Sequence, residues 1–368
     1  MGLKDDIREI EEEISETPYN KSTEKHIGRL KAKLSKLRDQ LQKRQSGGGG
    51  GGGYDVPKTG DATVAFVGFP SVGKSTLLNA LTNAESEIGD YGFTTLNVVP
   101  GMLKYEKTEI QVLDVPGMIE GASGGRGGGR EVMSVLRSAD LLLFVVDVFQ
   151  PDQYEMLREE LYENGIRMDT TPPNVRVTKK DRGGIKIRKS PDVELSDDLI
   201  REACRQHGYV NAHVVVREDL GIDRLNDALL DNRVYIDSMV CVNKVDLADS
   251  MVVQKTKEEL SEMGVDQAVG VSAEKEMGLG SLKQSILEEL NLKRIYLKPQ
   301  RGDPDYEDPV VMESEATVGD VARKIHRDFE GKFRFAKVWG DSVKHDGQQI
   351  GEEHRLEDED VLTLIMDR

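Results

Sequence analysis

Glycine, lysine and serine occur in residues 68–75 at the spacing of a phosphate-binding loop. The segment reads GFPSVGKS and fits the pattern G-x-x-x-x-G-K-[ST]. Gly68 and Gly73 allow the backbone to turn so that its N–H groups point at phosphate oxygens. Lys74 can place a positive charge beside the β and γ phosphates, and the Ser75 hydroxyl can ligate Mg²⁺. The loop therefore predicts a nucleoside triphosphate without naming its base. The residues predicted to contact it here are Gly68, Phe69, Pro70, Ser71, Val72, Gly73, Lys74, Ser75 and Thr76.

Three more residues are predicted to complete the phosphate and metal site. Asp114 and Gly117 form the pattern D-x-x-G after an apolar stretch, where Asp can hold Mg²⁺ through water and the glycine N–H can bind a γ-phosphate. Between this pattern and the loop lies Phe93-Thr94-Thr95, and one of its hydroxyls can complete the Mg²⁺ shell. Thr95 is preferred, with Thr94 as the alternative. The predicted catalytic residues are Lys74, Thr95 and Gly117, and the predicted metal ligands are Ser75, Thr95 and, through water, Asp114.

The sequence NKVD at residues 243–246 indicates which base is bound. The Asp246 carboxylate can accept hydrogen bonds from N1–H and N2–H₂ of guanine, and adenine offers no matching pair of donors. Asn243 can bridge to the phosphate-binding loop, and the Lys244 stem can lie over the base. Ser272 and Ala273, after a further strand, can offer backbone N–H to guanine O6. The set predicts GTP and GDP as ligands and argues against the alternative of an ATPase.

The elements around these motifs predict an α/β fold. Residues 62–68, 110–117, 141–148 and 239–246 read as buried strands, and a helix follows the loop from residue 74 to 83. Alternating strands and helices favour a mostly parallel sheet with helices on both faces. The distance in sequence between the last two strands far exceeds one crossover, so an inserted subdomain is expected at about 167–234.

The insert is expected to contain a basic β-hairpin formed by 174–178 and 184–189. Basic residues in a chain of net charge −17 suggest contact with an RNA backbone. The alternative is a solvated hairpin whose lysines discourage edge pairing. The RNA candidates are Arg176, Lys179, Lys180, Arg182, Lys186, Arg188 and Lys189.

The two ends of the chain predict further parts. Residues 1–46 show two apolar stripes separated by Pro18 and its neighbours, which predicts a helical hairpin with an acidic first arm and a basic second arm. Neutralisation within the hairpin and contact with RNA or a partner are both open for the basic arm. Residues 47–59 read as a glycine-rich linker, 60–290 as the nucleotide-binding domain with its insert, and 291–368 as a small α+β domain.

Composition limits the function classes. The net charge of −17 argues against non-specific binding to nucleic acid, and no DNA partner is expected. The charge fits either a salt-rich cytoplasm or an ordinary acidic protein. Two cysteines give no disulfide framework, which favours a cytoplasmic location. The most apolar run, 141–148, is too short to span a membrane.

The ordered motifs GFPSVGKS, FTTL, DVPGM, NKVD and VSA resemble those of the developmentally regulated GTP-binding (DRG) family of Obg-like GTPases, in an archaeal-type form. The resemblance covers nearly the whole chain. It implies a P-loop GTPase domain with an inserted α+β subdomain, an N-terminal helical hairpin and a C-terminal TGS domain of β-grasp fold. It also implies hydrolysis of GTP, association with ribosomes or RNA in translation, and a small regulatory partner protein.

The motif D-x-x-G departs from Ras-like enzymes in the residue that follows it. Met118 stands where those enzymes have a water-positioning Gln, so slow intrinsic hydrolysis is expected. Arg126 or Arg130, or a K⁺ ion near the loop, are the open candidates to supply the missing function; some cation-dependent relatives have Asn in place of Ser71. The alternative function is a nucleotide-gated RNA-binding or assembly factor with incidental turnover.

Overall fold

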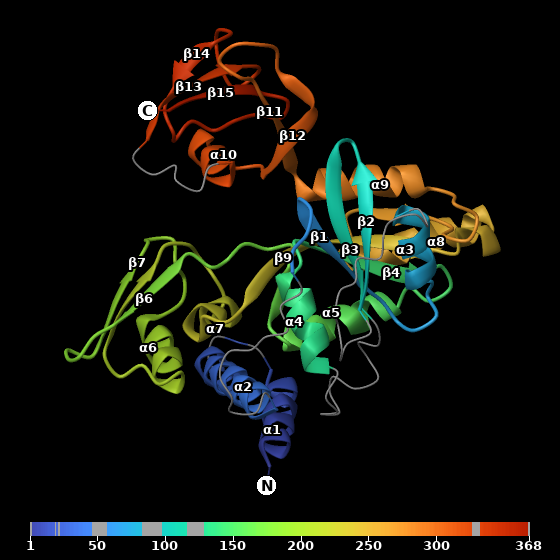
Figure 1. Ribbon diagram of the computed structural model, residues 1–368. Coiled ribbons are helices and arrows are strands. Elements are labelled where there is room, and N and C mark those ends of the chain that lie inside the picture. The colour runs from blue at the N-terminus through green and yellow to red at the C-terminus, as the bar shows by residue number, and fades with distance from the viewer. Residues whose placement is uncertain are drawn as a thin grey trace. The chain divides into compact units, whose positions relative to one another are not determined.

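The computed structural model (Figure 1) describes residues 2–18, 20, 23–45, 57–82, 98–115, 129–325 and 332–366. The chain forms two compact units. The first contains residues 1–53, 123–133 and 156–236, and the second contains 54–122, 134–155 and 237–368. No helix within the described ranges has both the length and the apolar character that crossing a membrane requires.

The main sheet carries the predicted nucleotide site. Its strand order is β10-β9-β4-β1-β3-β2, and β5 pairs with the first residues of β9. All neighbours pair in parallel except β2, which is antiparallel to β3. The strands are β1 (Ala62–Val67), β2 (Val99–Tyr105), β3 (Thr108–Asp114), β4 (Leu141–Asp147), β5 (Ile166–Met168), β9 (Val234–Asn243) and β10 (Ala268–Gly270). Every residue of β1 is buried, as expected for a central parallel strand covered on both faces.

Helices cover both faces of this sheet, as the sequence predicts. Leu77 of α3 (Lys74–Thr82) and Leu282 of α9 (Leu279–Leu290) pack in one core with Leu143 of β4. The next residue of β4, Phe144, points to the opposite face because side chains alternate along a strand. There it meets Tyr154 of α5 (Gln153–Glu163) with ring centroids 5.0 Å apart. The remaining helices of this region are α4 (Gly129–Ser138), the short η1 (Val245–Leu247) and α8 (Ser250–Glu262).

The C-terminal residues form a separate five-stranded sheet with the order β12-β11-β15-β13-β14. Its elements are β11 (Leu292–Leu297), β12 (Asp305–Glu313), α10 (Val318–Ile325), β13 (Phe333–Trp339), β14 (Gln348–Ile350) and β15 (Val361–Met366). Thr317 and Asp320 exchange the hydrogen bonds of a capping box at the start of α10. The Thr317 hydroxyl and backbone N–H both donate to the Asp320 carboxylate, and these bonds lower the pKa of Asp320 to about 2. The second unit contains both sheets, so the boundary near residue 291 stays a prediction.

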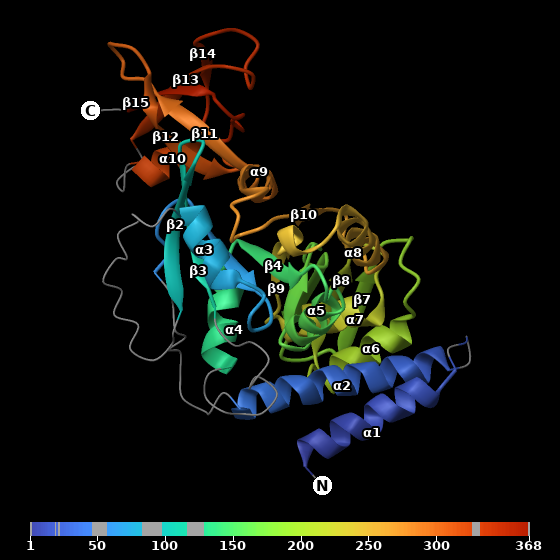
Figure 2. The ribbon, with the colours of Figure 1, turned by 90° about the vertical axis from the view of Figure 1, so that its right-hand side faces the viewer.

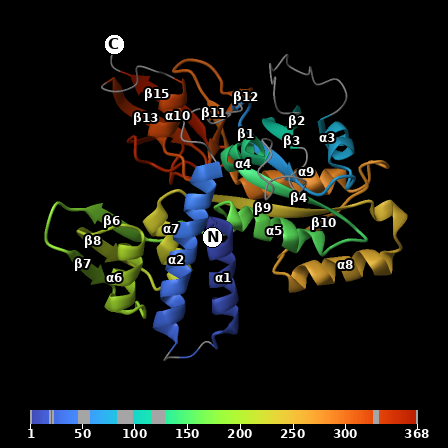
Figure 3. The same cartoon turned by 90° about the horizontal axis from the view of Figure 1, so that it is seen from below.

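The first unit contains the N-terminal helices and the insert. Figures 2 and 3 show α1 (Leu3–Glu16) and α2 (Glu24–Gln45) side by side as a hairpin. The insert contains β6 (Val175–Lys179), β7 (Ile185–Lys189), α6 (Asp197–Gln206), β8 (Ala212–Val216) and α7 (Ile222–Leu230).

The predicted β6–β7 hairpin is wrong. β8 lies between the two strands, antiparallel to β6 and parallel to β7. Ala212, Val214 and Val216 are buried almost completely, so β8 supplies the most apolar face and takes the central position. The strands β6 and β7 therefore form the two edges of the small sheet, although only a short loop separates them in sequence.

Three basic residues of α2 form ion pairs within the first unit. They meet carboxylates of α1, of α5 and of the insert helices α6 and α7. The pairs are Arg38 with Glu11 at 2.7 Å and Glu163 at 3.0 Å, Lys25 with Asp198 at 3.1 Å, and Lys31 with Asp223 at 2.6 Å. These ion pairs support the alternative in which the charge of the basic arm is neutralised. The partners include carboxylates of α5, α6 and α7 as well as those of α1.

Candidate functional site

The phosphate-binding loop connects β1 to α3, and two of its positions exclude any side chain. A Cβ at Gly68 would lie 2.6 Å from the backbone oxygen of Val145. Gly73 has φ of 96°, and a Cβ there would lie 2.4 Å from Nδ2 of Asn243. The loop is therefore seated closely against β4 and the end of β9. Ser71 also adopts a left-handed backbone, with φ of 65°, which Asn tolerates more readily than Ser.

The Lys74 ammonium lies inside the loop. Nζ donates to the backbone oxygens of Gly68 at 2.9 Å and Phe69 at 3.0 Å, and the residue is only 8% exposed. Burial lowers the pKa of Lys74 below that of a free lysine, and the charge of Asp114 acts in the opposite direction. Anionic phosphate oxygens beside the loop would favour the charged form further.

Ser75 and Asp114 bring two predicted metal ligands together. The Ser75 hydroxyl donates to Oδ2 of Asp114 at 2.5 Å. The other oxygen, Oδ1, is buried and has no hydrogen-bond partner within the described part of the chain. Hydroxyl and carboxylate oxygens are the donors that Mg²⁺ prefers, and an unsatisfied buried carboxylate oxygen calls for a cation or a bound water. The residues present therefore fit Mg²⁺.

Asn243 joins the phosphate loop to the base-binding segments. Its Nδ2 donates to the Val72 carbonyl at 2.9 Å, and its Oδ1 accepts from the backbone N–H of Ala273 at 3.1 Å. The bridge that the sequence predicts for Asn243 is thus present. The Ser272 N–H donates to the Met277 carbonyl at 3.0 Å. Because both N–H groups already have acceptors, a bond from either to guanine O6 has to share or replace one of these contacts.

Lys244 and Asp246, the other polar residues of NKVD, follow directly after the end of β9. Lys244 has a left-handed backbone with φ of 64°, and Nζ forms an ion pair with Oδ2 of Asp147 at 2.7 Å. Asp246, in η1, is partly exposed, and its carboxylate has no partner among the residues that the structure describes. A carboxylate without a protein partner can accept both guanine donors.

Asp147 is a site residue that motif reasoning missed. It ends β4, is half-enclosed, and also accepts from the Phe149 N–H at 3.0 Å. The missed signal was a carboxylate at the end of a strand that neighbours the NKVD strand.

Replacing Asp147 by Asn should weaken GTP and GDP binding alike, by about tenfold, because Lys244 loses the charge that holds its stem in place. The Asn oxygen can still accept from Phe149. Titration with a fluorescent guanine nucleotide measures the effect. Asp140→Asn is the matched control, since Asp140 pairs with Lys58 at 2.6 Å beside the other end of β4. Unchanged affinity in Asp147→Asn would refute the positioning role.

Several predicted site residues lie outside the described residues, namely Thr94, Thr95, Gly117, Met118 and Arg126. Arg130 falls in α4, but its side chain is not described. Their roles stay predictions.

Three of the RNA candidates, Arg176, Lys186 and Arg188, share one face of the insert sheet. Register places Arg176 and Arg188 on either side of Val215, and Thr178 and Lys186 on either side of His213. The side chains that alternate with them belong to the core packed on α6 and α7. We call Arg176, Lys186, Arg188 and His213 the basic sheet face; all four are exposed.

The other candidates do not belong to that face. Lys189 donates to the Leu195 carbonyl at 2.6 Å, and Lys179 lies 5.3 Å from the ring centroid of Tyr209. Lys180 and Arg182 are exposed in the loop between β6 and β7. Because β6 and β7 are edge strands, the edge-protection alternative also stays open.

Three models of known protein families match successive parts of the chain. A family model described as a 50S ribosome-binding GTPase matches residues 63–180. A model of the C-terminal region of that domain matches residues 182–292, and a TGS domain model matches residues 293–366.

Similar proteins cover the whole chain. An uncharacterized GTP-binding protein of Methanocaldococcus jannaschii is 53% identical over 100% of this chain and 94% of its own length. The developmentally-regulated GTP-binding protein 1 of Xenopus laevis is 43% identical over 98% of both chains. Among solved structures, the YchF GTPase of Schizosaccharomyces pombe matches 84% of this chain and 98% of its own at 15% identity, with a TM-score of 0.45.

Proposed function

The chain belongs to the DRG family of GTP-binding proteins, and from this premise we propose that it hydrolyses GTP to GDP and phosphate and thereby switches its association with ribosomes or RNA. The observation that carries the proposal is the position of Asn243. One side chain links the phosphate loop at Val72 to the base-binding segment at Ala273. Recognition of guanine and of the phosphates is therefore built on one rigid connection.

The chemistry follows from the residues around the phosphates. Lys74 and the loop N–H groups would stabilise negative charge that develops on the β–γ bridge. Ser75, Asp114 and Thr95 would hold Mg²⁺, which supplies charge neutralisation at the β and γ oxygens when bound with the nucleotide. The Gly117 N–H would bind the γ-phosphate.

Slow hydrolysis is part of the proposal. Met118 has no polar group to orient the attacking water, and a missing charge-stabilising element lowers turnover about 10³–10⁵-fold. Arg126, Arg130 or a K⁺ ion would have to supply it, and turnover compared in KCl and NaCl distinguishes the ion from the arginines. Because Met118 favours slow turnover, it also supports the second candidate function. This is a nucleotide-gated RNA-binding or assembly factor for which turnover is incidental.

The basic sheet face is the surface that we assign to RNA. Three basic side chains and an imidazole on an exposed sheet can contact successive phosphates, although the chain as a whole is acidic. Their neighbours on the sheet, Thr178 and Val215, add no negative charge.

Reversing two charges of this face, in Arg176→Glu with Arg188→Glu, should weaken ribosome or ribosomal RNA binding at least tenfold and reduce its dependence on salt. Co-sedimentation of the full chain with ribosomes, in a non-hydrolysable GTP analogue, measures retention. Lys33→Glu, an exposed change on α2, is the control and should bind as the wild type does. Equal retention of the double variant and the wild type would remove the basic sheet face from the proposal.

A further inference from the structure

The turn between β2 and β3 holds two residues in a backbone conformation that suits them poorly. Tyr105 pairs with Thr108, so Glu106 and Lys107 form a two-residue hairpin turn. Their φ angles are 48° and 63°, both left-handed. Turns of this kind favour Asn-Gly, because residues with larger side chains are strained there. Strain of this type persists where the surroundings fix it, and it gathers at functional positions.

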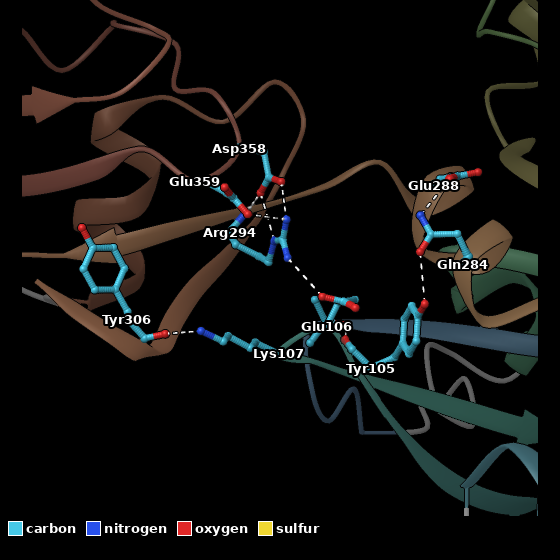
Figure 4. Close-up of polar contacts among 10 residues, drawn as sticks. Tyr105, Glu106, Lys107, Gln284, Glu288, Arg294, Tyr306, Asp358 and Glu359 are labelled. Carbon is cyan, nitrogen blue, oxygen red and sulfur yellow. Dashed lines mark hydrogen bonds and ion pairs between the residues drawn. The ribbon is translucent and has the colours of Figure 1, made fainter. Parts of the chain in front are cut away.

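Both turn side chains reach the C-terminal domain within the second unit (Figure 4). Nζ of Lys107 donates to the backbone oxygen of Tyr306 at 2.5 Å and lies 5.5 Å from the ring centroid of Tyr296. The Glu106 carboxylate lies 3.8 Å from Nη1 of Arg294. We call these two interactions, Lys107 with Tyr306 and Glu106 with Arg294, the turn contact.

The receiving surface is ordered by its own bonds. Arg294 is fixed by Asp358 at 2.7 Å and Glu359 at 3.1 Å, and is only 19% exposed. The rings of Tyr296 and Tyr306 meet edge-to-face with centroids 5.1 Å apart. The turn therefore meets a surface whose donors and acceptors are already in place, which reduces the entropy lost on contact.

The C-terminal domain is joined to the nucleotide-binding sheet by a short connection. Asn291 alone, with φ of 47°, lies between the end of α9 and the start of β11. Tyr105, next to the turn, also donates to Gln284 of α9 at 3.1 Å. One further ion pair, Lys324 with Asp61 at 4.0 Å, spans the same two parts. The C-terminal domain is thus attached through Asn291 and through a few polar contacts. Among these contacts, the turn contact includes the shortest distance, from Lys107 to Tyr306.

The other ends of the same two strands lie at the nucleotide site. β3 ends at Asp114, whose carboxylate bonds to Ser75. Val99, the first residue of β2, pairs with Asp114. In sequence, β2 follows the segment that contains Thr95. Figures 1 and 2 both show the hairpin running from the nucleotide-binding sheet toward β11 and β12. β3 is also paired with β1, whereas β2 is the edge strand of the sheet. A shift at Val99, the phosphate end of β2, would therefore reach the turn along β2.

We propose that the turn contact couples the nucleotide site to the C-terminal domain, so that GTP and GDP set different strengths of contact between Glu106-Lys107 and the surface of Arg294 and Tyr306. The inference rests on the proposed nucleotide switch and adds the route by which the bound nucleotide reaches this domain. Coupling is reciprocal, so breaking the turn contact must change the relative affinities for the two nucleotides.

The double variant Glu106→Asn with Lys107→Gly tests the coupling without endangering the fold. Asn-Gly is the preferred sequence for this turn, so the hairpin should be at least as stable while both side-chain contacts disappear. The affinities of the purified full chain for a non-hydrolysable GTP analogue and for GDP are measured by titration. Their ratio should differ at least threefold from that of the wild type. Amide exchange at β12 should depend on the nucleotide in the wild type and lose that dependence in the variant.

Lys104→Gln is the matched control. Lys104 pairs with Glu109 at 2.7 Å on the same hairpin, so its loss removes an exposed ion pair and leaves the turn contact intact. The control should keep the wild-type affinity ratio. If the turn variant binds both nucleotides with an unchanged ratio and an unchanged exchange pattern, the inference is overturned while the nucleotide switch stands. If the wild type binds no guanine nucleotide, the proposed function fails and this inference fails with it.

Discussion

Asp246→Asn should lower the affinity for GTP about 10³-fold. In the proposed site the carboxylate would accept two charge-assisted hydrogen bonds from guanine, each contributing about 1.5–3 kcal/mol, and the Asn side chain would turn a donor toward a donor. Xanthosine triphosphate carries a carbonyl where guanine carries the 2-amino group, so it can accept from the Asn amide. The variant should therefore prefer xanthosine triphosphate to GTP.

Competition of GTP, xanthosine triphosphate and ATP against a fluorescent guanine nucleotide measures this preference. Asp249→Asn is the control, because Asp249 caps α8 through the Val252 N–H and Asn caps a helix equally well. It should bind GTP as the wild type does. A variant at Asp246 that kept full GTP affinity, or a wild type that bound ATP as tightly as GTP, would show that NKVD does not select the base here.

Lys74→Met should lower the single-turnover rate of GTP hydrolysis by about 10³-fold or more. Met keeps most of the stem but removes the buried charge that we propose stabilises the β–γ bridge, and one group of this kind contributes about 3–4 kcal/mol in a water-excluded site. The affinity for GTP should fall as well, since the same charge would contact the phosphates in the ground state.

Rapid mixing of excess enzyme with radiolabelled GTP, at protein concentrations above the weakened dissociation constant, separates the rate from the affinity. Lys255→Met on the exposed face of α8 is the matched substitution and should leave both quantities unchanged. Hydrolysis by Lys74→Met at the wild-type rate would mean that other groups carry the transition-state charge.

The parts of the site that the sequence predicts well are those whose chemistry is local. Gly68 follows the end of β1, Lys74 begins α3 and Asn243 ends β9, and at such positions the residue type and its neighbours decide the conformation. A parallel sheet then brings the carboxyl ends of β1, β3 and β9 to one edge without further information. The positions of Thr95 and Gly117 stay predictions, because both lie outside the described residues.

The parts that it missed depend on pairing between distant segments. The order β6-β8-β7 is decided by which strand has the most apolar face to bury, and a short loop between β6 and β7 does not reveal it. Asp147 acquires its role only because β4 lies beside β9, which brings its carboxylate to Lys244. The turn contact likewise needs two parts of the chain far apart in sequence.

The most direct measurement is retention of the full, unmodified chain on ribosomes in two nucleotide states. We expect the chain to sediment with ribosomes in a non-hydrolysable GTP analogue, and we expect at least tenfold lower retention in GDP. Equal retention in both nucleotides, or none in either, would contradict a nucleotide-controlled role at the ribosome.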